Sequence, residues 1–162
     1  MYLDGLSFLE DERDAWRPFE ALDALSDEAL SRPVAAAHGW SGRDLMAQLV
    51  AWQEIALAVA RELAVGGTSP TLERVVAEWE TGGAAMNERL LREWAALPLD
   101  EVRRRFRTVP GELRGTLTVV PEARWVKHDR HRSALLGATL DHYADHEADL
   151  AAILAASGVA GS

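Results

Sequence analysis

The sequence predicts an all-α protein built as a four-helix bundle. Two observations lead to this prediction. Apolar residues recur at steps of three and four over several long stretches, as they do on a helix face that packs against a core. Capping residues, prolines and glycines separate these stretches at points where helices typically begin and end. With 162 residues, the chain is long enough to bury an adequate core, and we expect a single domain over residues 1–162.

The first helix is expected to begin at Ser7, because Ser7 and Glu10 have the spacing of a capping box. Pro18 interrupts the apolar stripe of this helix and should kink it, since proline removes a backbone donor. Ser26 is placed to cap one further short helical turn that ends near Pro33. The stripe consists of Phe8, Leu9, Ala15, Trp16, Phe19 and Leu22.

The second helix has the clearest signals. Ser41 and Asp44 form a capping box, and Trp40 and Leu45 have the spacing of a hydrophobic staple. Glycines at positions 66 and 67 should end the helix. A core-facing stripe runs between these limits through Leu45, Leu49, Trp52, Ala56, Val59 and Leu63.

A third helix should begin at Ser69-Pro70, with proline at its favoured first position, and end before Pro98. Its apolar stripe includes Leu72, Val75, Val76, Trp79, Met86, Leu90 and Leu97. Gly82 and Gly83 fall in the middle and weaken the helix. We therefore expect either a kink there or the close approach of a neighbouring helix.

The segment before the last helix is the hardest to interpret. Asp100 is expected to cap a short helix that ends near Phe106, and residues 109–112 (VPGE) carry a turn signal. Residues 114–120 are compatible with a short strand or an irregular loop. The last helix is then expected over residues 131–156, with an inner face made of Leu135, Thr139, His142, Tyr143, His146, Leu150 and Ile153.

Composition narrows the possible functions. The chain has 17 Lys and Arg against 26 Asp and Glu, a net charge of −9, which argues against nucleic-acid binding. No apolar run approaches the roughly 20 residues that span a bilayer, and the N-terminus lacks the features of a signal peptide. Cysteine is absent, so thiolate ligands and nucleophiles are excluded. We expect a cytoplasmic protein that binds no membrane. The basic cluster at residues 103–107 indicates either an anion site or a solvated helix face.

His142 and His146 are the most informative pair in the chain. Residues four apart on a helix project from the same face, so both imidazoles can reach one point and supply half of a metal site. Gln48 lies between Leu45 and Trp52 on the second helix and points near the bundle interior. A buried amide needs a partner, so Gln48 either meets the histidines or faces a solvated cleft. The simpler alternative is a hydrogen-bonded core group of these three side chains without metal.

Two segments resemble a known superfamily. Residues 39–53 (GWSGRDLMAQLVAWQ) resemble the second-helix signature of DinB-like proteins, whose usual form is G-W-S-x-x-D-x-x-A-H-L-x-x-W. Residues 140–150 (LDHYADHEADL) are similar to its final H-x-x-x-H helix, and Met86-Asn87 is a weaker resemblance in the third helix. The superfamily includes the N-terminal domains of mycothiol-dependent maleylpyruvate isomerases and the DfsB-type proteins. Helix order and spacing extend the resemblance over most of the chain, which implies a DinB-like four-helix bundle.

The resemblance also implies a metal site. In the superfamily, one histidine of the second helix and two of the last hold a divalent metal. These ligands correspond by position to Gln48, His142 and His146. Glutamine at the first position is a departure, because its neutral amide oxygen is a weak and uncommon ligand for zinc or nickel.

The implied activity is that of a metal-dependent transferase, isomerase or hydrolase, in which the metal activates water or a thiol cosubstrate for reaction with a small molecule. The alternative is a non-catalytic bundle that binds a hydrophobic small-molecule ligand or a partner and keeps a degenerate metal site. A homodimer formed through an apolar helix face is compatible with both.

Other residues have a functional and a structural interpretation. His128 and His131 are replacement ligands only if the chain folds back, and are otherwise surface residues near a helix start. Asp44 is a general base or simply a capping residue. His38 is expected to be an unconstrained loop residue, and Tyr143 either meets a bound substrate or packs in the core. Four tryptophans are expected either to line a pocket or to pack in the core: Trp40, Trp52, Trp79 and Trp94.

Overall fold

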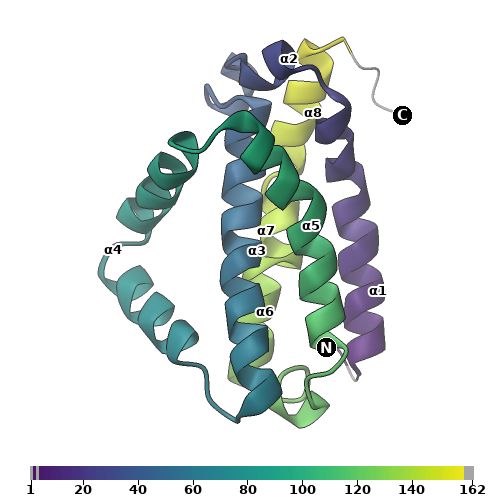
Figure 1. Cartoon of the computed structure of the whole chain (residues 1–162), viewed down its shortest axis with the longest axis vertical. Helices are drawn as coiled ribbons and strands as arrows, with labels where there is room; N and C mark the ends of the chain where they lie inside the picture. The colour runs from purple at the N-terminus through teal and green to yellow at the C-terminus, as the bar shows by residue number, and fades with distance from the viewer. Residues whose placement is uncertain (1, 3, 159–162) are drawn as a thin grey trace.

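The computed structural model describes residue 2 and residues 4–158, and over these residues it contains helices and no strands (Figure 1). The α-helices are α1 (Gly5–Trp16), α2 (Asp27–Ser31), α3 (Gly42–Val65), α4 (Pro70–Ala95), α5 (Leu99–Leu117), α6 (Asp129–Ala138), α7 (Leu140–Asp145) and α8 (Glu147–Ala156). Short 3₁₀ segments occupy Arg17–Ala24, Ala35–Ala37 and Glu122–Arg124. The all-α prediction is therefore confirmed.

The helices are arranged around α3 (Figure 1). α1, α3, α5 and the consecutive segments α6, α7 and α8 run alongside one another, whereas α4 lies on the outer side of α3 and bows away from it between its ends. Residues 70–97 were predicted to form one of the four long helices of the bundle. They form α4, which makes an outer wall beside α3.

The start of α1 differs from the prediction. The helix begins at Gly5, and the Asp4 side chain caps it by accepting a hydrogen bond from the Ser7 backbone N–H (2.8 Å). Ser7 is thus a donor to the cap, and the predicted capping box of Ser7 with Glu10 is wrong. Pro18 acts as predicted, because α1 ends at Trp16 and the chain continues as a 3₁₀ helix.

The predicted caps of the next helices are confirmed. The Ser26 side chain caps α2 and the Ser69 side chain caps α4, each by accepting a backbone hydrogen bond. Ser41 and Asp44 form a complete capping box at the start of α3, which ends at Gly66. Asp44 therefore has a structural role, as part of the cap of α3.

α5 is much longer than predicted. Pro110 lies inside the helix, and residues 114–117 are helical, so both the turn at residues 109–112 and the possible strand at 114–120 are wrong. The physical reason is tertiary packing, because the apolar face of α5 continues past Pro110 against α3. Burial of that face outweighs the backbone hydrogen bond that proline removes. The buried apolar residues of this face are Val102, Phe106, Val109, Leu113 and Leu117.

α4 is broken at the predicted glycines. Gly82 has φ 178° and ψ 71°, which interrupts the helix. A Cβ atom on Gly83 would lie 2.9 Å from the Trp79 ring, so glycine is needed there for the indole to pack against the backbone. Trp79 itself is 48% exposed, at the bend of the helix.

The last helix is not continuous, contrary to prediction. The backbone leaves helical geometry at Thr139 (φ −127°, ψ −99°) and again at His146 (φ −110°, ψ 7°). The Thr139 hydroxyl donates a 2.6 Å hydrogen bond to the Leu135 carbonyl. The Thr139 backbone N–H donates to the Leu136 carbonyl and not to that of Leu135. Competition of this kind between a side chain and the backbone bends helices.

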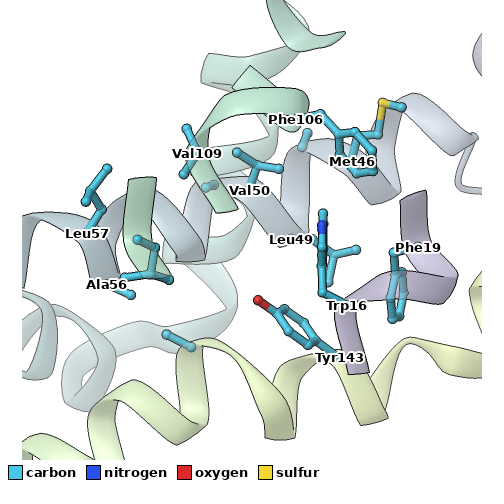
Figure 2. Close-up of a cluster of buried hydrophobic side chains, with 14 of the residues drawn as sticks. Trp16, Phe19, Met46, Leu49, Val50, Ala56, Leu57, Phe106, Val109 and Tyr143 are labelled. Atoms are coloured by element: carbon cyan, nitrogen blue, oxygen red, sulfur yellow. The ribbon is translucent and has the colours of Figure 1, made fainter. Parts of the chain in front are cut away.

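The core on the far side of α3 from α4 is aromatic (Figure 2). Trp16 contacts Phe19, Phe106 and Tyr143, with ring centroids 5.1–5.6 Å apart. Leu49 of α3 lies beside this group and is fully buried.

A polar network runs through the same core. The Tyr143 hydroxyl donates to Glu12 (2.8 Å) and accepts from Gln53 (2.7 Å), while Arg114 pairs with the other Glu12 oxygen (3.0 Å). Tyr143 is therefore a packing residue that joins α7 to α1 and α3. None of the helices over residue 2 and residues 4–158 is both long and apolar enough to cross a membrane.

The observed caps predict different effects for two serines. Ser41→Ala should lower the free energy of unfolding by about 1 kcal/mol, because it removes the acceptor at the start of α3. Ser7→Ala should change it little, since only the Ser7 backbone N–H takes part in the α1 cap. Urea unfolding followed by circular dichroism measures both. A larger loss in Ser7→Ala than in Ser41→Ala would contradict the observed caps.

Candidate functional site: an aromatic cleft with a polar end

A cleft of about 1000 Å³ lies between α3, α4 and the segments α6 and α7. Its wall is mostly apolar, with aliphatic side chains from α3 and α4 and the indoles of Trp40, Trp52 and Trp79. Trp52 and Trp79 meet edge to face, with ring centroids 5.6 Å apart. Three of the four tryptophans proposed for a pocket therefore line it, whereas Trp94 lines a separate, smaller pocket, with the guanidinium of Arg105 over its ring.

Gln48, His142 and His146 all line this cleft. Gln48 comes from α3, His142 from α7, and His146 from the break between α7 and α8. The imidazoles of His142 and His146 are 4.8 Å apart between centroids and meet edge to face at 73°. They are neighbours as predicted, although the helix that was expected to align them is interrupted at His146.

The hydrogen bonds of Asn87 determine the orientation of the Gln48 amide. Trp52 Nε1 can only donate, and it donates to Asn87 Oδ1 (3.0 Å). The Gln48 amide nitrogen donates to the same oxygen (2.9 Å), so the Gln48 carbonyl oxygen must point elsewhere. That oxygen is buried and has no hydrogen-bond partner among the described residues, and Gln48 as a whole is only 3% exposed.

His142 is a buried imidazole without a partner. Within the described residues neither ring nitrogen makes a hydrogen bond, and Nδ1 is fully buried. Burial, with a smaller contribution from neighbouring His146, lowers the pKa of His142 to about 3. The ring is therefore neutral at physiological pH and keeps a lone pair that no protein donor uses.

His146 is held more firmly. Its Nδ1 atom lies 2.9 Å from Oδ2 of Asp149, and its ring stacks on Trp40 with centroids 5.3 Å apart. The other Asp149 oxygen lies 3.1 Å from Nδ1 of His38. The sequence analysis missed Asp149 and treated His38 as unconstrained. The spacing of three residues between His146 and Asp149 was the one available signal.

The simpler alternative of a closed core group is not what forms here, because Gln48 bonds to Asn87 and not to the histidines. The other candidates lie outside the cleft. His128 and His131 stack on each other at the start of α6, with centroids 3.8 Å apart. The basic residues 103–107 are engaged in ion pairs with Asp23, Asp27 and Glu101.

The polar end of the cleft has donors that suit a divalent metal. Two ring centres that share one metal should lie about 5 Å apart, since each metal–nitrogen bond is about 2.0–2.1 Å. The 4.8 Å between His142 and His146 fits this requirement. Within residue 2 and residues 4–158, no group of three or more His, Asp and Glu side chains is placed to hold a metal. A complete ligand set would therefore need the Gln48 oxygen or water.

Comparisons of the chain with known protein families, curated proteins and solved structures found no match. The DinB-like resemblance accordingly rests on the two sequence segments quoted above. Single-domain organisation, dimerisation and cytoplasmic location stay predictions.

The environment of His142 predicts an unusual titration. Burial lowers the pKa of His142 from 6.5 to about 3, so the ring is protonated more readily in the unfolded chain than in the folded protein. The free energy of unfolding should therefore decrease as the pH falls from about 6.5 toward 3. At about pH 5, the His142 ring should still give the NMR shifts of a neutral imidazole. A His142→Phe variant assigns the signal. A midpoint near 6.5 would contradict burial of the ring.

Proposed function

We propose that this protein is a DinB-like four-helix bundle that holds a divalent metal, zinc or nickel, in the cleft and acts on a small molecule. His142, His146 and Gln48 are the proposed ligands. The observation that carries the proposal is the convergence of these three side chains, from distant parts of the sequence, on one cleft. Gln48 Oε1 and His142 Nδ1 are buried without partners among the described residues, which is costly unless a ligand satisfies them.

The residues of the cleft have separate tasks in this proposal. His142 stays neutral through burial and offers a lone pair, and Asp149 orients His146. Asn87 turns the Gln48 oxygen away from itself. The tryptophans bind the apolar part of the substrate. The bound metal would supply Lewis-acid chemistry toward water or a thiol cosubstrate.

Metal content tests the proposal. Tag-free protein incubated with zinc and desalted should retain roughly one ion per chain by plasma mass spectrometry. His142→Ala should lose the metal, whereas Gln48→His should bind it more tightly because imidazole is the stronger ligand.

His128→Asn is the matched control, since it removes an exposed histidine outside the cleft and keeps a residue that can cap α6. Thermal unfolding of each variant shows whether it is folded. Wild-type protein that stays empty with both zinc and nickel would contradict the proposal, and so would equal metal content in wild type and a folded His142→Ala variant.

The size and lining of the cleft favour a second function, the binding of an apolar small molecule without metal chemistry. A volume of about 1000 Å³ lies at the upper end of small-molecule pockets, and its walls are mainly aliphatic and aromatic. On this alternative, the histidines are remnants and the tryptophans provide the affinity.

Binding of the fluorescent probe anilinonaphthalene sulfonate tests this second function. Val76→Asp puts a negative charge into the apolar wall and should reduce probe binding at least tenfold, because the carboxylate is costly to desolvate and repels the anionic sulfonate of the probe. Val65→Asp is the matched control, since Val65 is 87% exposed and does not line the cleft. Equal binding by the two variants would contradict ligand binding in the cleft.

A further inference from the structure

Asp149 joins two histidines from different parts of the chain. Its Oδ2 lies 2.9 Å from Nδ1 of His146, and its Oδ1 lies 3.1 Å from Nδ1 of His38. The Asp149 side chain is 8% exposed and that of His146 15%, whereas His38 is 84% exposed. A buried carboxylate thus has both oxygens engaged by imidazoles, one at the surface and one in the cleft.

The backbone of His38 has a conformation that is unusual for a residue other than glycine. His38 has φ 59° and ψ 25°, the left-handed region, which is unfavourable for a residue with a Cβ atom. Two backbone hydrogen bonds hold the turn, from Gly39 N–H to the Val34 carbonyl (3.0 Å) and from Val34 N–H to the Trp40 carbonyl (2.9 Å). The turn brings His38 to α8 and Trp40 onto the face of His146.

Asp149 lies in the first turn of α8, where a carboxylate commonly caps the backbone. Here α8 has no side-chain cap, and the carboxylate serves the imidazoles instead. A carboxylate can only accept, so His146 Nδ1 must carry the proton. The lone pair of His146 is then on Nε2, which makes no hydrogen bond within the described residues and can bind a ligand.

We infer that Asp149, held by His38, is a positioning residue that selects the tautomer and orientation of His146 for metal binding. The inference depends on the proposed function for the use of this positioning, which is metal binding. The tautomer and orientation of His146 can be tested on metal-free protein. Carboxylate–histidine pairs of this kind determine ligand geometry at many metal sites, and their loss typically weakens metal affinity by about 10–100-fold.

The first test uses metal-free protein. Long-range ¹H–¹⁵N NMR spectra at about pH 8, where an ordinary histidine is neutral, should show His146 as the Nδ1–H tautomer. Asp149→Asn should keep this tautomer, because the amide oxygen still accepts. Asp149→Ala should lose it. An Nε2–H tautomer in the wild type overturns the inference whether or not metal is bound.

The second test measures zinc affinity by competition with a chromophoric chelator. Asp149→Ala should weaken binding by about 10–100-fold, and Asp149→Asn should recover part of the loss. Asp145→Ala is the matched control, because it removes the same charge from a residue that lines the cleft but makes no hydrogen bond to either histidine within the described residues. His38→Gly, which removes the imidazole at a left-handed position, should weaken binding less than Asp149→Ala.

The outcomes separate the two hypotheses. If the wild type binds neither zinc nor nickel, the proposed function fails, and the tautomer still decides the role of Asp149. If the wild type binds zinc and Asp149→Ala binds it equally well, the inference fails and the metal site stands. If Asp149→Ala does not fold, the wild-type tautomer and the Asp149→Asn variant still test the inference.

Discussion

Burial of α3 on several sides is the constraint on which the rest of the structure depends. Fourteen of its 24 residues are buried, and α2, α4, α5, α6 and α8 all pack against it. A helix in that position is expected to be apolar around most of its surface. α3 nevertheless buries two glutamines, and the amide nitrogen of each donates to a residue of another helix: Gln53 to Tyr143 and Gln48 to Asn87. These contacts link the central helix to the core on one side and to the cleft on the other.

The two breaks in the last helix give neighbouring residues different environments. Tyr143 packs on Trp16 in the aromatic core, whereas His142, one residue earlier, lines the cleft. The break at His146 starts a new helix, and its first turn carries Asp149 beneath the imidazole. A continuous helix would also bring the two histidines together. It would lack the break at His146, which now determines the position of that imidazole. The bend of α4 at Gly82 similarly keeps an outer wall at a distance from α3, so that the cleft stays open.

Sequence reasoning worked where the signal is local. The capping box of Ser41, the proline start of α4 and its glycine break need only neighbouring residues, and all three are observed. It failed where distant packing decides, as in α5, where burial against α3 carries the helix through Pro110. The orientation of Gln48 toward the bundle interior was likewise predictable from helix periodicity, whereas the contact of His38 with Asp149 was not. That contact joins residues 111 positions apart.

The central claim is that Gln48, His142 and His146 form the binding end of the cleft. The most direct measurement is an anomalous difference map from crystals of the zinc-loaded protein. The account predicts a peak in the cleft within about 2.0–2.2 Å of a nitrogen of each histidine, with Gln48 or water completing the shell. A map with no peak in the cleft, or with its zinc at the stacked pair of His128 and His131, would contradict it.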